Sequence, residues 1–153
     1  MLDRTDPART GVKAGRVVGS VTAAVAIAAL VRPEASFYRG TTTALRLVGV
    51  ESADLVTVVV AGNAVIAGVA RYTVGYVVGS LVGVVYDWLD HSTVALVGTV
   101  AVVGLADAVL AVLDTRSPLV GAGYFFAWLA YVPVFYWFAP DSWTDDDGPL
   151  RLG

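Results

Sequence analysis

Several residue types are almost missing from this chain. It has no cysteine, a single histidine (His91) and a single lysine (Lys13). The lack of cysteine excludes disulfides, thiol catalysis and iron–sulfur ligation, and one histidine argues against a haem or a histidine-based metal site. No lysine lies inside an apolar segment, which excludes a retinal Schiff base. Without a Ser–His–Asp set, a phosphate-binding loop or a basic face, we expect no cofactor, no enzymatic activity and no nucleic-acid partner.

Charge is also scarce. Only 15% of the 153 residues are charged, while 57% are hydrophobic. Soluble domains carry about 25% charged residues, so most of this chain must face something other than water. The composition predicts an all-α integral membrane protein that crosses the cell membrane several times and contacts lipid.

The few charges present are unevenly chosen. Acidic residues outnumber basic ones by 13 to 10, and Glu34 and Glu51 are the only glutamates. An aspartate-rich, lysine-poor chain of this kind resembles the proteins of extreme halophiles, whose carboxylates keep the surface hydrated in molar salt. The resemblance concerns composition over the whole chain and indicates no family.

Apolar segments occupy most of the chain between residues 17 and 139, which we treat as one transmembrane domain. Residues 1–16 form a basic segment that is typical of a cytoplasmic N-terminus. A signal peptide is the alternative for the first apolar segment, but no clean A-x-A site follows it. We predict spans at about 15–31, 54–69, 74–89, 93–113 and 119–138, followed by an acidic, disordered tail at 140–153.

The stretch from Ser52 to Asp90 decides the topology. As one helix it would be roughly 55 Å long, whereas the hydrocarbon core of a bilayer is about 30 Å thick. Two short spans that turn at residues 70–73, with Arg71 in a cytoplasmic turn, remove this excess. The alternative is a single tilted or kinked helix, which gives four transmembrane helices and one re-entrant or interfacial helix.

The basic residues support the five-span topology weakly. With the N-terminus inside, six of them lie on the cytoplasmic side and four outside, which agrees with the positive-inside rule. The six are Arg4, Arg9, Lys13, Arg16, Arg71 and Arg116.

Gly75, Gly79 and Gly83 form a glycine-zipper pattern, with small residues spaced four apart. Such a series forms a groove that lets another helix backbone approach closely. Gly104 and Ala108 offer a partner face in the next span. The series indicates either an interface between subunits or packing within one subunit.

Three polar residues fall inside predicted spans. Asp107 lies about 10 Å from the end of its span, where an ionisable group is costly unless it is paired or hydrated. Arg71 could reach it from the cytoplasmic side. The pair indicates either a structural ion pair or an ion-handling site, and Asn63 either joins helices or lines a cavity.

Asp87, Asp90 and His91 are weak candidates for a metal site, because one helical turn supplies too few ligands. A solvated acidic loop is the other interpretation. The aromatic residues of 119–138 suggest an interfacial belt with lipid-facing side chains, and Pro133 suggests a kink.

Two classes of function remain. The glycine series favours a non-enzymatic protein that acts through helix packing, as an accessory or assembly subunit or a homo-oligomer. The alternative is a small transporter or channel that uses Arg71, Asp107 and Asn63.

Overall fold

The computed structural model describes residues 6–32 and 35–139, and every regular element within them is an α-helix. The predicted tail at 140–153 lies outside the described residues. Four stretches are long and apolar enough to cross a membrane, namely α1, α3, α4 and the α5–α6 pair. The expected all-helical membrane architecture is therefore confirmed. The helices are α1 (Pro7–Leu30), α2 (Ser36–Leu47), α3 (Ala53–Trp88), α4 (Thr93–Thr115), α5 (Pro118–Leu129) and α6 (Tyr131–Phe138).

The long helix α3 contradicts the predicted hairpin. It runs unbroken for 36 residues, so there is no turn at residues 70–73 and there are no separate spans at 54–69 and 74–89. Those four residues include no proline, glycine or asparagine that would favour a turn. At its start, the Ser52 hydroxyl caps the helix by accepting the Leu55 N–H at 3.3 Å. Four long helices and one shorter helix match the count of the alternative topology.

Helix α1 begins eight residues before the predicted span at 15–31. Asp6 caps its start by accepting the Ala8 N–H at 2.9 Å, and Pro7 occupies the first turn. The basic residues from Arg9 to Arg16 are therefore helical, rather than part of a separate N-terminal segment. Lys13 lies against an aromatic ring, with its Nζ 5.5 Å from the Phe138 centroid.

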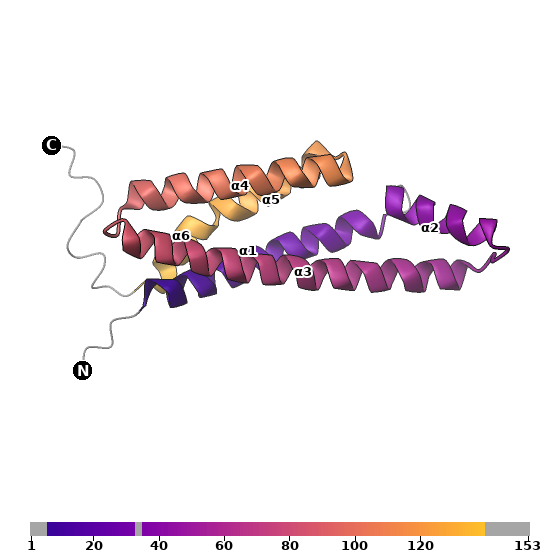
Figure 1. The fold of residues 1–153 in the computed structure, drawn as a ribbon, viewed down its shortest axis with the longest axis horizontal. Coiled ribbons are helices and arrows are strands. Elements are labelled where there is room, and N and C mark those ends of the chain that lie inside the picture. The colour runs from indigo at the N-terminus through magenta and orange to yellow at the C-terminus, as the bar shows by residue number, and fades with distance from the viewer. Residues whose placement is uncertain (1–5, 33–34, 140–153) are drawn as a thin grey trace.

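Consecutive long helices run antiparallel to one another, and α1 begins at the same end of the bundle at which α6 finishes (Figure 1). The most extensive contacts join α1 to α3 and α4 to α5. Helices α5 and α6 also pack on α1, whereas α3 and α4 touch each other sparsely although they are neighbours in sequence. The bundle thus consists of two tightly packed helix pairs.

Glycines bring α1 and α3 together at very short range. A Cβ atom on Gly15 would lie 2.4 Å from the carbonyl oxygen of Gly75, and one on Gly79 would lie 2.4 Å from the Cα of Gly15. Neither position can accept a side chain without moving the backbone. The glycine series of α3 therefore packs on its own chain, against a second series in α1 with the same four-residue spacing. The contact is lined by Gly11, Gly15 and Gly19 of α1 and by Gly75, Gly79 and Gly83 of α3.

Aromatic side chains of α5 and α6 fill the space beside this contact. Trp128, Tyr131 and Phe135 are fully buried, and the Tyr131 hydroxyl donates a hydrogen bond to the Gly79 carbonyl at 2.7 Å. The prediction of a lipid-facing belt is wrong for these three residues, although Trp137 is exposed as expected. The helix is interrupted at Ala130, between α5 and α6.

This interruption agrees with the predicted kink at Pro133. Proline has no N–H to donate to the carbonyl four residues earlier, which here belongs to Leu129, the last residue of α5.

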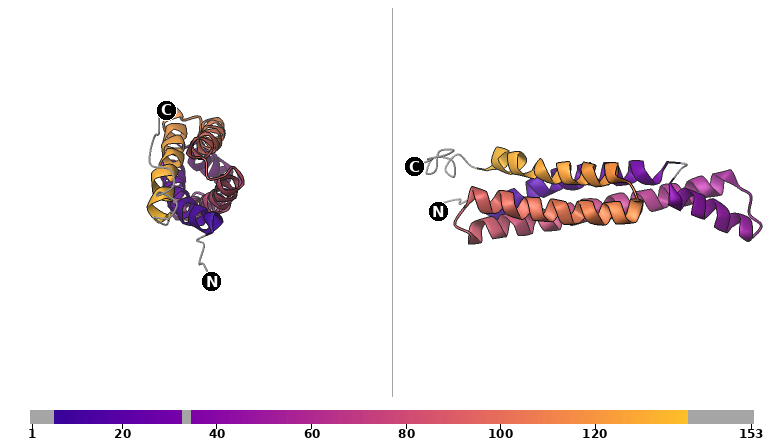
Figure 2. Two further views of the ribbon diagram at one scale, coloured as in Figure 1. Left: turned by 90° about the vertical axis from the view of Figure 1, so that its left-hand side faces the viewer. Right: turned by 90° about the horizontal axis from the view of Figure 1, so that it is seen from above.

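One end of α3 extends beyond the rest of the bundle. At 1.5 Å per residue α3 is about 54 Å long, against roughly 35 Å for α1 and α4. Gly68 lies beside Ile27, close to the end of α1, so the first part of α3 projects past that end. Helix α2 lies alongside the projecting part (Figures 1 and 2). We call residues 53–62 the α3 overhang.

The glycine contact generates a stability prediction. Replacing Gly79 with alanine should lower the free energy of unfolding by about 1–3 kcal/mol, because the new methyl group meets the backbone of α1. Gly62→Ala is a matched control in the same helix, since nothing lies within 4 Å of its added Cβ. Unfolding in detergent followed by circular dichroism measures both variants. Equal effects of the two substitutions would contradict the close contact.

Candidate functional site

Arg71 and Asp107 form an ion pair inside the bundle, between α3 and α4. The sequence suggested this pair, but it placed Arg71 in a cytoplasmic turn. Instead, Arg71 lies 18 residues into α3, and Asp107 lies eight residues, or about 12 Å, from the end of α4. The two side chains are 25% and 14% exposed. The pair connects two helices that otherwise make few contacts.

Two aromatic residues of α5 complete this cluster. The Trp128 indole N–H donates to the second carboxylate oxygen of Asp107 at 3.0 Å. The Arg71 guanidinium carbon lies 4.5 Å from the centroid of the Tyr124 ring, within range of a cation–π contact. Both charged groups therefore have partners on two helices. Such an arrangement stabilises charges that would be costly in a lipid environment, and it ties α3, α4 and α5 together.

Asn63 does not belong to this cluster. It lies two helical turns from Arg71 along α3, where it lines a cavity of about 880 Å³ at the end of the bundle. The cavity is bounded by the ends of α1 and α4, the start of α5 and one face of α2. Lining a cavity is one of the two roles that the sequence suggested for Asn63.

Gly104 and Ala108 pack on α5, and not on the glycine series of α3. A Cβ on Gly104 would lie 2.8 Å from the Cβ of Trp128, so this glycine makes room for the indole that reaches Asp107. Ala108 lies opposite Gly121 of α5. Their predicted role as a face for the glycines of α3 is wrong, because α1 occupies that position.

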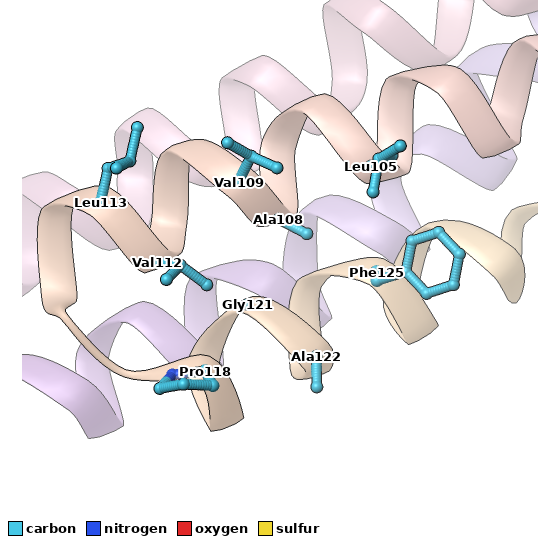
Figure 3. A pocket seen from close by; sticks show the side chains of 9 residues that line it. All are labelled: Leu105, Ala108, Val109, Val112, Leu113, Pro118, Gly121, Ala122 and Phe125. Atoms are coloured by element: carbon cyan, nitrogen blue, oxygen red, sulfur yellow. The ribbon is translucent and has the colours of Figure 1, made fainter.

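The outer side of the α4–α5 pair carries an apolar groove of about 380 Å³ (Figure 3). Large side chains such as Leu105, Val109 and Phe125 border it, and the small residues Gly121 and Ala122 also line it. The side chain of Leu105 is 59% exposed and that of Val109 is 50% exposed. A groove of this composition in a spanning segment suits lipid acyl chains.

The weak metal candidates cluster at the turn between α3 and α4. His91 Nε2 lies 3.4 Å from an Asp87 carboxylate oxygen, and its ring meets Tyr86 edge-on at 5.2 Å between centroids. Asp90 and His91 both have positive φ, which is uncommon outside glycine. Within residues 6–32 and 35–139, no three His, Cys, Asp or Glu side chains are grouped to hold a metal ion.

Exposed apolar residues mark the far end of the overhang. Val58 is 65% exposed, and Leu47 at the end of α2 is 82% exposed. These side chains lie at the end of the molecule formed by α2 and the α3 overhang, past the end of α1. We call this surface the apolar tip, and sequence reasoning missed it because the predicted hairpin placed residues 54–69 inside a span. The apolar tip comprises Leu47, Val48, Leu55, Val58 and Val59.

Comparisons with protein-family models, curated proteins and solved structures found no match to this chain. Its function is therefore inferred from its own residues.

The ion pair generates an asymmetric stability prediction. Asp107→Leu should destabilise the protein by about 2 kcal/mol or more, because it leaves a guanidinium that cannot lose its charge and removes the acceptor of Trp128. Arg71→Leu should cost less, because an unpaired carboxylate can take up a proton. The double variant should recover most of the loss. Chemical unfolding in detergent measures all three, and a double variant that is no more stable than Asp107→Leu would contradict a structural pair.

Proposed function

We propose that this small multi-pass membrane protein is a non-enzymatic subunit that joins other membrane proteins, or further copies of itself, through its apolar tip. The observation that supports the proposal is the exposure of large apolar side chains on a helix that projects about 15 Å past the end of α1. A bilayer that covers α1, α4 and the α5–α6 pair leaves this tip outside the hydrocarbon. Apolar side chains in that position are stabilised by contact with a partner.

The glycine series is not available for such a partner. The notion that Gly75, Gly79 and Gly83 join subunits requires their groove to be open, but α1 fills it within the same chain. The apolar tip lies away from this contact, so a partner that binds the tip leaves the packing of α1 on α3 intact.

We infer that the N-terminus is cytoplasmic and that α2 and the overhang lie outside. With four spans, five basic residues fall on the inner side and four on the outer side, which agrees weakly with the positive-inside rule. Arg71 lies within the span and is not counted. The inner residues are Arg4, Arg9, Lys13, Arg16 and Arg151, and the outer ones are Arg32, Arg39, Arg46 and Arg116.

A transporter or channel that uses Arg71, Asp107 and Asn63 has weaker support. Arg71 and Asp107 are engaged with each other and with α5, and Asn63 lies about 12 Å along the helix from Arg71. Proton or ion flux through proteoliposomes that is lost in the Arg71→Leu/Asp107→Leu variant, but present in the wild type, would favour this function instead.

Cross-linking tests the proposed interface and the orientation together. The chain has no cysteine, so Val58→Cys introduces a unique reactive site on the tip. A membrane-impermeant reagent that pairs a maleimide with a photoactivated diazirine is added to intact cells and illuminated. It should join this variant to a partner chain, because the diazirine inserts into the partner without needing a thiol there. Arg116→Cys is the matched control, because Arg116 is exposed on the same side of the membrane but lies in the turn between α4 and α5, away from the tip.

The outcomes separate the two claims. Cross-linking of Val58→Cys only after the cells are opened would reverse the orientation and keep the interface. No more cross-linking than in Arg116→Cys under either condition would contradict the interface.

A further inference from the structure

We propose that the cavity between α2 and the end of the bundle binds the headgroup of a phospholipid whose polar end carries a hydroxyl or ammonium donor. Its volume of about 880 Å³ lies within the range of small-ligand sites in proteins. Polar and apolar residues both line it. They include Leu30, Arg32, Phe37, Asn63, Asp114 and Ser117.

The position of the cavity matches the level of lipid headgroups. Leu30 is the last residue of α1, Asp114 is next to last in α4, and Ser117 immediately precedes α5. Three spanning segments therefore end at the cavity, and this is where hydrocarbon gives way to the polar region of a bilayer. A phospholipid can reach the cavity without leaving the membrane.

Helix α2 forms the outer wall of the cavity without packing tightly on the bundle. None of its residues is buried, although Phe37, Thr41 and Ala44 line the cavity. Residues 37, 41 and 44 share one face of a helix, because they are spaced four and three apart. A helix whose inner face meets an open space leaves room for a ligand between itself and the bundle.

The charges in the cavity indicate what the ligand carries. Arg32 and Asp114 both line it, yet these two described residues form no ion pair with each other. A guanidinium binds phosphate strongly, through charge-assisted hydrogen bonds. A carboxylate accepts hydrogen bonds from hydroxyl or ammonium groups and repels a second anion. A phosphodiester that ends in glycerol or ethanolamine satisfies both groups, whereas choline offers no donor to Asp114.

Binding of defined lipids to the purified full-length chain tests the proposal. Phospholipids with glycerol, ethanolamine or choline headgroups and identical acyl chains are titrated, and bound lipid is counted by native mass spectrometry. The wild type should prefer the glycerol and ethanolamine lipids to the choline lipid. Arg32→Gln should weaken binding of all three by about tenfold, because it removes the charged partner of the phosphate.

Two further variants separate the roles of the charges from effects on folding. Asp114→Leu should remove the preference over choline while phosphate binding persists, because leucine offers no hydrogen-bond acceptor. Ala44→Trp should lower binding of every lipid by filling the cavity from α2. Arg9→Gln, an exposed arginine at the opposite end of α1, is the control and should bind lipid like the wild type.

The proposal is overturned if Arg32→Gln binds all three lipids as tightly as Arg9→Gln does, or if Ala44→Trp leaves binding unchanged. Equal binding of the choline and ethanolamine lipids by the wild type would contradict the proposal that Asp114 selects headgroups with a hydrogen-bond donor. None of these results depends on the apolar tip, so this test and the cross-linking test can fail separately.

Discussion

The close approach of α1 and α3 is the constraint on which the other features depend. Because glycines face each other, the backbones come within a distance that no side chain would allow. The Tyr131 hydroxyl can then reach the Gly79 carbonyl from α6, which joins the second helix pair to the first. The same contact supports the middle of α3 as a helix, where its apolar length alone suggested a turn.

The sequence predicted the class of fold and the most unusual contact, but not the topology. Scarce charge and long apolar segments were enough to identify a multi-pass helical protein, and the isolation of Asp107 within a span pointed to Arg71. The error over residues 70–73 arose because the length of the segment was compared only with the thickness of a bilayer, and that comparison did not allow for a continuous helix longer than the bilayer. The glycines of α1 were overlooked because Arg9, Lys13 and Arg16 gave that segment a polar character.

Stabilisation is distributed differently in the two halves of the molecule. Towards the end where α1 begins, glycines bring α1 and α3 together and buried aromatic rings pack beside them. At the other end, α1 and α4 finish, whereas α3 continues and packs against α2. The Arg71–Asp107 pair lies close to the cavity, because Arg71 is one helical turn along α3 from Ala67, which lines it. The cavity and the apolar tip both lie where α3 extends past the end of α1, so the proposed lipid binding and the proposed assembly have a common structural origin.

The continuity of α3 is the central claim, and one distance tests it most directly. Nitroxide labels on Asp54→Cys and Asp87→Cys, in a chain with no other cysteine, report the span of the helix by double electron–electron resonance in lipid nanodiscs. A continuous helix places the labelled positions about 50 Å apart. A distance below about 20 Å would show that the segment turns back on itself within the bilayer, as two short antiparallel spans would require.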